Sequence, residues 1–371
     1  VGQYEFQCLH GMGEPLYEQV VGEKQDKKLG VPCRIYAPVG NHETLLAYLV
    51  RRLLENGANT SFVNRIADKS LAIDDLIENP TQTILSSAKR ENIVGQKHLS
   101  IPLPAELYGQ LRANSKGLDL ANDSALIHLN QTAQQFAKHQ WSAAPMGEHF
   151  QTNDAVAPQS IINPARHSDV VGYVQEATTE QVEQALNNAQ AVQDIWARTA
   201  KDTRASYLLR AADLMEARLE ELMVLLCRES GKTYANAIAE VREAVDFLRY
   251  YATQMIDLDA NAEVEPLGTM LCISPWNFPL AIFTGQVAAA LVAGNTVIAK
   301  PAEQTPLIAA QAIQILWQAG VPQAAVQLMP GRGETVGAQL SAAEQVQGIM
   351  FTGSTEVAKI LQKTVAKRLS K

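Results

Sequence analysis

The chain lacks long apolar runs, has few cysteines and shows no concentration of positive charge. No stretch of about 18 apolar residues occurs, so the sequence predicts no transmembrane helix. Its four cysteines show no CxxC spacing, which argues against a zinc site and a disulfide framework and fits a reducing cytoplasm. A formal net charge of -8 argues against a nucleic-acid-binding surface, which requires clustered lysine and arginine.

The two ends of the chain indicate that it is a piece of a longer protein. The first residue is Val1 rather than methionine, and residues 363–371 still have the sequence of a helix. A length of 371 residues exceeds one ordinary core but is short for two complete catalytic domains. We therefore expect an internal fragment.

The first part of the sequence predicts a βαβ unit. Residues 34–39 and 60–65 have strand patterns, and residues 43–56 have the pattern of a helix that ends at Gly57. Parallel sheets and barrels are built from such units. Between about residues 70 and 150 the pattern weakens and prolines interrupt it, so this stretch is interpreted as a connector with one helix at 124–139.

The second part of the sequence predicts a doubly wound α/β domain. Residues 161–175 are expected to form two short strands around a turn, followed by a capping box at 178–181. Amphipathic helices then run to 197, over 204–227 and over 235–255, and short buried strands are predicted at 269–273, 296–299 and 348–351. No internal repeat relates the two parts.

One face of the predicted helix 43–56 is unusually basic. Helical spacing brings Tyr48, Arg51, Arg52 and Glu55 to one side. Two guanidinium groups beside one carboxylate leave surplus positive charge, which suits a small carboxylate ligand. A solvent-exposed Arg51–Glu55 pair explains the same pattern, so the residues alone leave both interpretations open.

Polar residues follow the buried strands of the second part. Asn277 comes after the strand 269–273, where its amide can donate to an oxyanion, although a turn asparagine would look the same. Lys300 and Glu303 follow the next strand and can bracket ribose hydroxyls, and a carboxylate there disfavours a 2'-phosphate. The turn 351–354 precedes a helix expected to begin near Thr355, which favours pyrophosphate binding.

Two features of this part are interpreted as structural. The run Gly331–Gly337 is GxGxxxG rather than the GxGxxG fingerprint, so we expect a turn that leads into a helix, with contact to a cofactor as the alternative. Cys272 lies within an apolar run with no histidine or cation beside it, which indicates core packing rather than catalysis. The same interpretation applies to Cys8, Cys33 and Cys227.

Three sequence blocks, 273–280, 294–306 and 351–354, resemble in their order and spacing the NAD-binding half of an aldehyde dehydrogenase. The resemblance implies that Asn277 stabilises the oxyanion formed when a thiolate attacks an aldehyde. It also implies a set of residues in contact with NAD, namely Pro275, Trp276, Lys300, Glu303, Gly353 and Ser354. That family keeps its nucleophilic cysteine and general-base glutamate in a segment that would follow Lys371, so we expect this fragment to be inactive by itself.

Residues 5–12 and 36–63 resemble the carboxyl-terminal end of a proline dehydrogenase barrel. The resemblance implies that Arg51 and Arg52 hold the carboxylate of proline and that Tyr36 and Tyr48 wall its ring. Glu55 would lie near the FAD or steady the two arginines, and Gln7 and Leu9 would lie where a barrel strand approaches the flavin. A flavin that takes hydride from the ring needs the protein mainly to position and desolvate the substrate.

The fusion of both segments on one chain resembles the proline utilisation A family of bifunctional enzymes. The implied reactions are oxidation of L-proline to pyrroline-5-carboxylate with FAD, hydrolysis to glutamate semialdehyde, and oxidation to glutamate with NAD. The implied fold is an α/β arrangement in three parts: the end of a (β/α)8 barrel at 1–90, a helical connector at 91–150 and the NAD-binding half of an aldehyde dehydrogenase at 151–371.

The resemblance also bears on partners and on rival functions. A homo-oligomer in the full-length protein and peripheral association with the inner membrane are expected, although the connector has no strongly basic amphipathic face. One rival is a single-function aldehyde dehydrogenase with an unrelated amino-terminal extension. Another is a DNA-binding regulator, because some members of the family carry a ribbon-helix-helix segment upstream.

Overall fold

The computed structural model describes residues 4–10, 17–18, 21–22, 27–43, 45–46, 50, 70–74, 79–92, 94, 101–150, 157–258 and 265–369. The chain divides into two compact units, residues 1–96 and 97–371. In the first unit, β1 (Phe6–Leu9) pairs in parallel with β2 (Cys33–Tyr36), and α5 (Pro80–Arg90) follows. The strand predicted over 34–39 is therefore confirmed for residues 34–36, where β2 ends. The predicted helix 43–56 and strand 60–65 lie largely outside the described residues.

A parallel four-stranded sheet forms the centre of the second unit. Its order is β8 (Val326–Leu328), β7 (Val297–Lys300), β6 (Thr269–Ile273) and β9 (Val346–Phe351). Alternate residues of β6 enter two different clusters of buried side chains: Met270 and Cys272 join one and Leu271 the other. A parallel sheet that is buried on both faces is the doubly wound arrangement that the sequence predicts.

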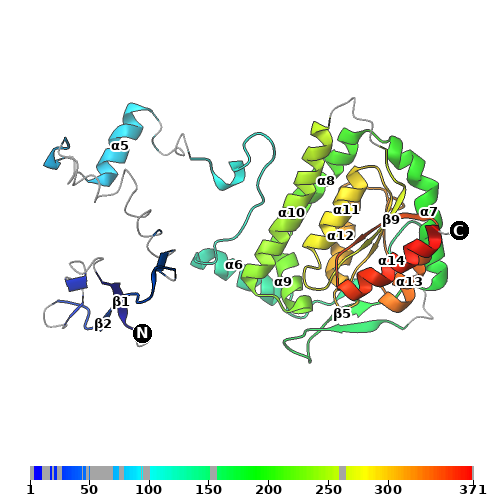
Figure 1. Cartoon of the computed structure of the whole chain (residues 1–371), viewed down its shortest axis with the longest axis horizontal. Coiled ribbons are helices and arrows are strands. Elements are labelled where there is room, and N and C mark those ends of the chain that lie inside the picture. Colours follow the sequence, from blue (N-terminus) through cyan, green and yellow to red (C-terminus); the bar gives the residue numbers. More distant parts are fainter. Residues whose placement is uncertain are drawn as a thin grey trace. The chain divides into compact units, whose positions relative to one another are not determined.

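Helices cover both faces of this sheet (Figure 1). Helices α11 (Ala281–Val292) and α12 (Pro306–Gln318) pack on one face, and α7 (Thr179–Arg198) and α13 (Ala338–Ala342) pack on the other. Thr178 caps α7 through the predicted capping box, which is confirmed. Helix α14 (Thr355–Leu369) follows β9, and its predicted start is confirmed.

Three long helices extend the core beyond α11 and α12. They are α8 (Lys201–Ala217), α9 (Leu219–Ser230) and α10 (Tyr234–Asp257). The prediction of a single helix over 204–227 is wrong. The helix is interrupted at Arg218, because its φ of -103° and ψ of 16° lie outside the helical region. Helix α10 packs against α8, α9 and α11.

The remaining elements precede or border this core. A 3-10 turn at Pro104–Glu106 and α6 (Asp123–Gln135) lead to a small sheet of β3 (Trp141–Ala143), β5 (Val170–Val174) and β4 (Gln159–Ile162). Residues 97–150, which include most of the predicted connector, therefore belong to the second unit. The predicted domain boundaries remain predictions.

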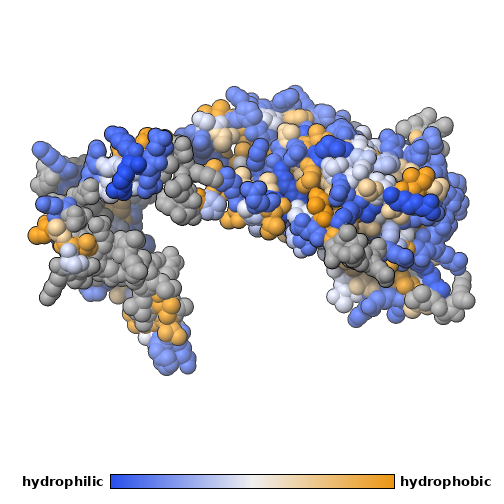
Figure 2. All heavy atoms as spheres, turned by 90° about the horizontal axis from the view of Figure 1, so that it is seen from above, coloured by the Kyte–Doolittle hydropathy of each residue, from blue (hydrophilic) through white to orange (hydrophobic). Residues whose placement is uncertain are grey.

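The surface of the second unit is mixed in polarity. Figure 2 shows hydrophilic residues over most of its visible face, with smaller hydrophobic patches between them. Among the described helices, none combines the length and the apolar composition needed to cross a membrane.

Candidate functional site

The loops that carry the residues predicted to bind NAD and the aldehyde leave the same edge of the four-stranded sheet. Ile273, the last residue of β6, is in register with Lys300 of β7 and with Phe351 of β9. Backbone bonds continue past the strands, because Ser274 N donates to Lys300 O (3.3 Å) and Thr352 N donates to Ile273 O (3.1 Å). Ligands of doubly wound folds bind at this carboxyl edge.

Lys300 is the most deeply buried of the predicted site residues that the structure describes, with 3% of its surface exposed. Its Nζ donates to Pro301 O at 3.0 Å and lies 3.9 Å from Glu303 Oε2. Burial lowers the pKa of Lys300, whereas the carboxylates of Glu303, Glu334 and Glu176 act in the opposite direction. Lys300 and Glu303 are therefore brought together as an ammonium and a half-exposed carboxylate, the arrangement that the sequence predicts for a ribose.

A cavity of about 450 Å³ adjoins this pair. Glu303, Glu334, Glu176 and Arg332 line it together with parts of β4 and β5. The Gly331–Gly337 run therefore has a second role: Gly333–Gly337 forms a π-helical turn that leads into α13, as predicted, and Gly331, Arg332 and Glu334 also form a wall of the cavity. The sequence favoured the first of these roles and left contact with a cofactor as the alternative.

Gly353 and Ser354 form the turn between β9 and α14. The Ser354 hydroxyl accepts a hydrogen bond from Val357 N (3.3 Å), so this serine caps the helix. A Cβ at Gly353 would lie 2.5 Å from Phe351 Cζ, which means that no larger residue fits without a shift of that ring. The exposed turn therefore presents the amino-terminal end of a 15-residue helix, where backbone N–H groups favour an anion.

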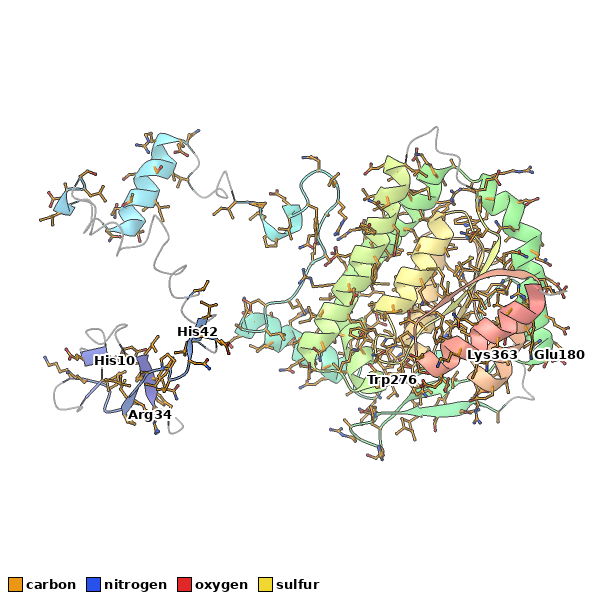
Figure 3. The ribbon with its side chains drawn as sticks, in the orientation of Figure 1. His10, Arg34, His42, Glu180, Trp276 and Lys363 are labelled. Atoms are coloured by element: carbon orange, nitrogen blue, oxygen red, sulfur yellow. The ribbon has the colours of Figure 1, made fainter. Side chains whose placement is uncertain are left out.

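Asn277 lies in the exposed turn between β6 and α11, next to Trp276 and Phe278. Trp276, which Figure 3 labels, is 59% exposed. The backbone oxygen of Asn277 accepts a hydrogen bond of 2.8 Å from Lys232 Nζ, a residue that the sequence interpretation did not consider. Pro275 precedes this group at the end of β6, so the segment 275–277 is held at the same edge as Lys300.

Two buried glutamates that the sequence interpretation also missed cap the helices behind the site. Glu240 Oε1 accepts from Leu280 N (2.8 Å) and Ala281 N (3.3 Å) at the start of α11. Glu229 accepts from Leu307 N (2.7 Å) and Ile308 N (2.9 Å) at the start of α12. Burial raises the pKa of Glu229 to about 8. A carboxylate on the apolar side of α10, between Ala237 and Val241, is the signal that could have identified Glu240.

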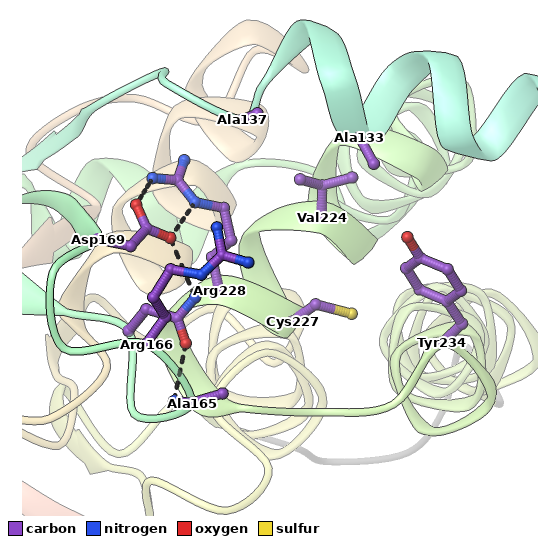
Figure 4. Close-up of a pocket in the computed structure, with 10 residues that line it drawn as sticks. Ala133, Ala137, Ala165, Arg166, Asp169, Val224, Cys227, Arg228 and Tyr234 are labelled. Atoms are coloured by element: carbon purple, nitrogen blue, oxygen red, sulfur yellow. Dashed lines mark hydrogen bonds and ion pairs between the residues drawn. The ribbon is translucent and has the colours of Figure 1, made fainter.

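The environments of two cysteines are unsuited to a nucleophile. Cys272 is 1% exposed within the core, and burial raises the pKa of its thiol to about 12. Cys227 borders a separate cavity of about 280 Å³, and burial raises its pKa to about 11 (Figure 4). In that cavity the Arg228 guanidinium binds Asp169 (2.6 and 3.1 Å) and the backbone oxygens of Phe136 and His139, so its role is to hold chain segments together. Cys8 is also buried.

The predicted proline and flavin residues are described only in part. Tyr36 of β2 is 44% exposed and lies in register with Leu9 of β1. Gln7 is exposed, and its Nε2 donates to Glu5 Oε1 at 3.3 Å. Tyr48, Arg51, Arg52 and Glu55 lie outside the described residues. Their predicted roles therefore stay predictions.

The chain resembles known proteins in both sequence and structure. Residues 150–371 match the aldehyde dehydrogenase family, and residues 1–65 match proline dehydrogenase. The bifunctional protein PutA of Escherichia coli (strain K12) is 61% identical over 99% of this chain and 28% of its own length. The 1-pyrroline-5-carboxylate dehydrogenase of Anoxybacillus flavithermus is 37% identical over 67% of this chain and 50% of its own length.

Solved structures of PutA and of 1-pyrroline-5-carboxylate dehydrogenase also resemble this chain. The structure of PutA from Bdellovibrio bacteriovorus, inactivated by N-propargylglycine, has a TM-score of 0.72 and 32% identity, and covers 98% of this chain and 37% of that chain. A Thermus 1-pyrroline-5-carboxylate dehydrogenase with bound NAD has a TM-score of 0.63 and 30% identity over 72% of this chain and 52% of that one. The chain thus spans less than a third of the length of the PutA sequence from E. coli. It belongs to the aldehyde dehydrogenase family, and residues 1–65, which match proline dehydrogenase, precede the matched domain.

Proposed function

We propose that this chain is a segment of a bifunctional enzyme of proline catabolism. Its first part would belong to a unit that oxidises L-proline to pyrroline-5-carboxylate with FAD. Its second part would belong to a unit that oxidises glutamate semialdehyde to L-glutamate with NAD. The order of the two family matches on one chain supports this proposal, and the proline dehydrogenase match argues against an unrelated amino-terminal extension.

The observation that carries the NAD assignment is the buried Lys300 beside Glu303 and the cavity that Glu303 lines. Lys300 would donate to a ribose hydroxyl and Glu303 would accept from one. The Glu303 carboxylate disfavours a 2'-phosphate, hence NAD rather than NADP. Gly353, Ser354 and the start of α14 would receive the pyrophosphate. When bound, NAD supplies the hydride acceptor of the aldehyde oxidation.

Asn277 would donate its side-chain N–H to the oxyanion of the aldehyde under attack, with Pro275 and Trp276 beside it at the cofactor. Such a donor typically contributes about 100- to 1,000-fold in rate. Cys272 is buried and Cys227 is partly buried, and burial raises the pKa of both thiols. We therefore place the nucleophile and the general base in sequence outside these 371 residues, and the chain by itself would not turn over aldehyde.

For the proline reaction, Arg51 and Arg52 would hold the carboxylate of L-proline while Tyr36 and Tyr48 enclose its ring. Gln7, Leu9 and Glu55 would contact the FAD. This assignment is supported by the residue pattern and by the proline dehydrogenase match over residues 1–65. We further propose that the full-length protein is a cytoplasmic homo-oligomer, peripheral to the inner membrane, with no nucleic acid bound through this segment.

The two activities can be tested by a pair of crossed variants in the full-length protein that contains this chain. The Arg51→Met variant should lose most proline-dependent dye reduction and keep NADH formation from supplied glutamate semialdehyde. The Asn277→Ala variant should lose about 100-fold or more of the NADH formation and keep the dye reduction. Each variant is the control for the other. Loss of both activities in both variants, or of neither in either variant, would contradict the assignment.

A further inference from the structure

A buried ion pair lies directly behind the exposed turn that carries Asn277. Lys232 Nζ is 2.9 Å from Glu240 Oε2, and the two side chains are 12% and 0% exposed. Removal of two charges from water costs several kcal/mol per ion unless further hydrogen bonds compensate for the lost hydration. The groups that form these further hydrogen bonds with Lys232 and Glu240 indicate the function of the ion pair.

Both members of the pair also contact the segment 277–281. Lys232 Nζ donates to the backbone oxygen of Asn277 (2.8 Å) and lies 4.6 Å from the centre of the Phe278 ring. Glu240 accepts from the backbone N–H groups of Leu280 and Ala281. One ion pair therefore binds the turn at its beginning and at its end.

The turn does not obtain this order from its own residues. Helix α11 has no side-chain cap at its N-cap residue, Leu280, and Trp276, Asn277 and Phe278 are exposed. The anchor comes from a different part of the chain, where Gly231 ends α9 in the left-handed conformation (φ +69°) and Lys232 follows it. A fixed peptide on the carboxyl side of Asn277 restricts the directions that its side chain can take.

We propose that Lys232 and Glu240 are positioning residues that hold the Asn277 amide in its direction toward the aldehyde oxyanion. The proposal rests on the proposed aldehyde oxidation for its consequence in catalysis. Neither residue needs to touch substrate. Displacement of a catalytic group by about 1 Å can cost about 100-fold in rate, so loss of the anchor should appear in kcat.

The catalytic test compares three variants in the full-length protein that contains this chain. Lys232→Met should lower kcat for NADH formation about 10- to 100-fold and leave the Kd of NAD within about 2-fold. This variant also leaves Glu240 buried without its cation, which should lower the melting temperature. In the Lys232→Met/Glu240→Gln double variant the uncompensated charge is gone, so the melting temperature should recover while kcat stays low. Lys232→Arg should restore part of kcat.

Recovery of both kcat and the melting temperature in the double variant would overturn the proposal, because the pair would then serve stability alone. A second measurement does not depend on activity. Trp276 is adjacent to Asn277, so the time-resolved fluorescence anisotropy of the 371-residue chain, minus that of its Trp276→Phe variant, reports the motion of this turn. The amplitude of nanosecond motion should rise in both Lys232→Met and the double variant.

Unchanged motion of Trp276 in a folded double variant would also overturn the proposal. If the unmodified full-length protein failed to oxidise glutamate semialdehyde, the proposed function would fall. The anisotropy result would still decide whether Lys232 and Glu240 order the turn.

Discussion

At the scale of the residue, Lys300 is held both by polar partners for its ammonium group and by packing of its aliphatic chain against Gly337. A lysine that is 3% exposed must keep its ammonium beside oxygen atoms, and Pro301 O and Glu303 provide them. The aliphatic part of the side chain passes Gly337, where a Cβ would lie 3.3 Å from Lys300 Cε and 3.5 Å from Cδ. Because Gly337 has no side chain, the space beside it is available to the side chain of Lys300.

The Gly337→Ala variant should weaken NAD binding. Gly337 has an ordinary helical φ of -62°, so alanine adds no backbone strain and acts only through its pressure on Lys300. An effect of about 1 kcal/mol corresponds to a roughly 5-fold higher Kd. Isothermal titration of the chain with NAD measures it. The matched control is Gly333→Ala, because a Cβ there meets nothing within 4 Å. Equal effects of the two variants would exclude this explanation.

At the scale of the element, helices α11 and α12 receive their caps from distant parts of the chain. Neither has a side-chain cap in its own sequence, and the carboxylates that bind their first N–H groups come from Glu240 and Glu229. The separations are 40 residues for Leu280 and Glu240 and 78 residues for Leu307 and Glu229. The Glu240 carboxylate, paired with Lys232, also opposes the positive end of α11.

The stability of the chain should therefore depend on the protonation of Glu229. Its pKa is about 8 in the folded chain, against 4.5 as the ordinary value. Between these pH values the folded state holds the proton and the unfolded state has lost it, so the contribution of this residue to stability is greatest below pH 4.5 and falls as pH rises toward 8. The decline from this residue should be on the order of 1 kcal/mol per pH unit.

Urea unfolding of the 371-residue chain between about pH 5 and pH 9 measures this dependence. The Glu229→Gln variant cannot titrate at this position and should show a flatter profile. The control is Glu344→Gln, which changes an exposed carboxylate and should keep the profile of the unmodified chain. A Glu229→Gln profile that is parallel to that of the unmodified chain would argue that Glu229 ionises normally.

Short-range signals determine which elements the sequence could predict. The capping box at Thr178 and Gln181 and the strand 269–273 depend on neighbouring residues, and both are confirmed. Strands β3 and β8 were missed because each has only three residues. In the site, Lys300 and Glu303 were predicted from their place after a strand, whereas Lys232, Glu229 and Glu240 act through partners that are distant in sequence.

At the scale of the whole molecule, the segment before α6 packs as part of the second unit. Asp246 of α10 binds Arg112 Nη1 (2.9 Å), Ser115 N (3.1 Å) and Ser115 Oγ (2.6 Å). Lys116 N donates to Glu216 at 2.7 Å, and the side chains of Asn114 and Ser115 are buried. These contacts were invisible in the sequence because they join residues that lie 100 or more positions apart.

A protein limited to residues 97–371 should melt within about 2 °C of the second-unit transition of the whole chain, since this unit has its own core.

The polar contacts of Asp246 should contribute measurably to the stability of residues 97–371. The Asp246→Ala variant leaves the Ser115 and Arg112 donors without their acceptor and should cost about 2 to 3 kcal/mol, or roughly 5 to 10 °C. It should also speed proteolysis after Arg112 and Lys116. The control is Asp257→Ala, because Asp257 is the exposed last residue of the same helix. Equal melting temperatures of the two variants would mean that residues 112–116 contribute little to holding this unit together.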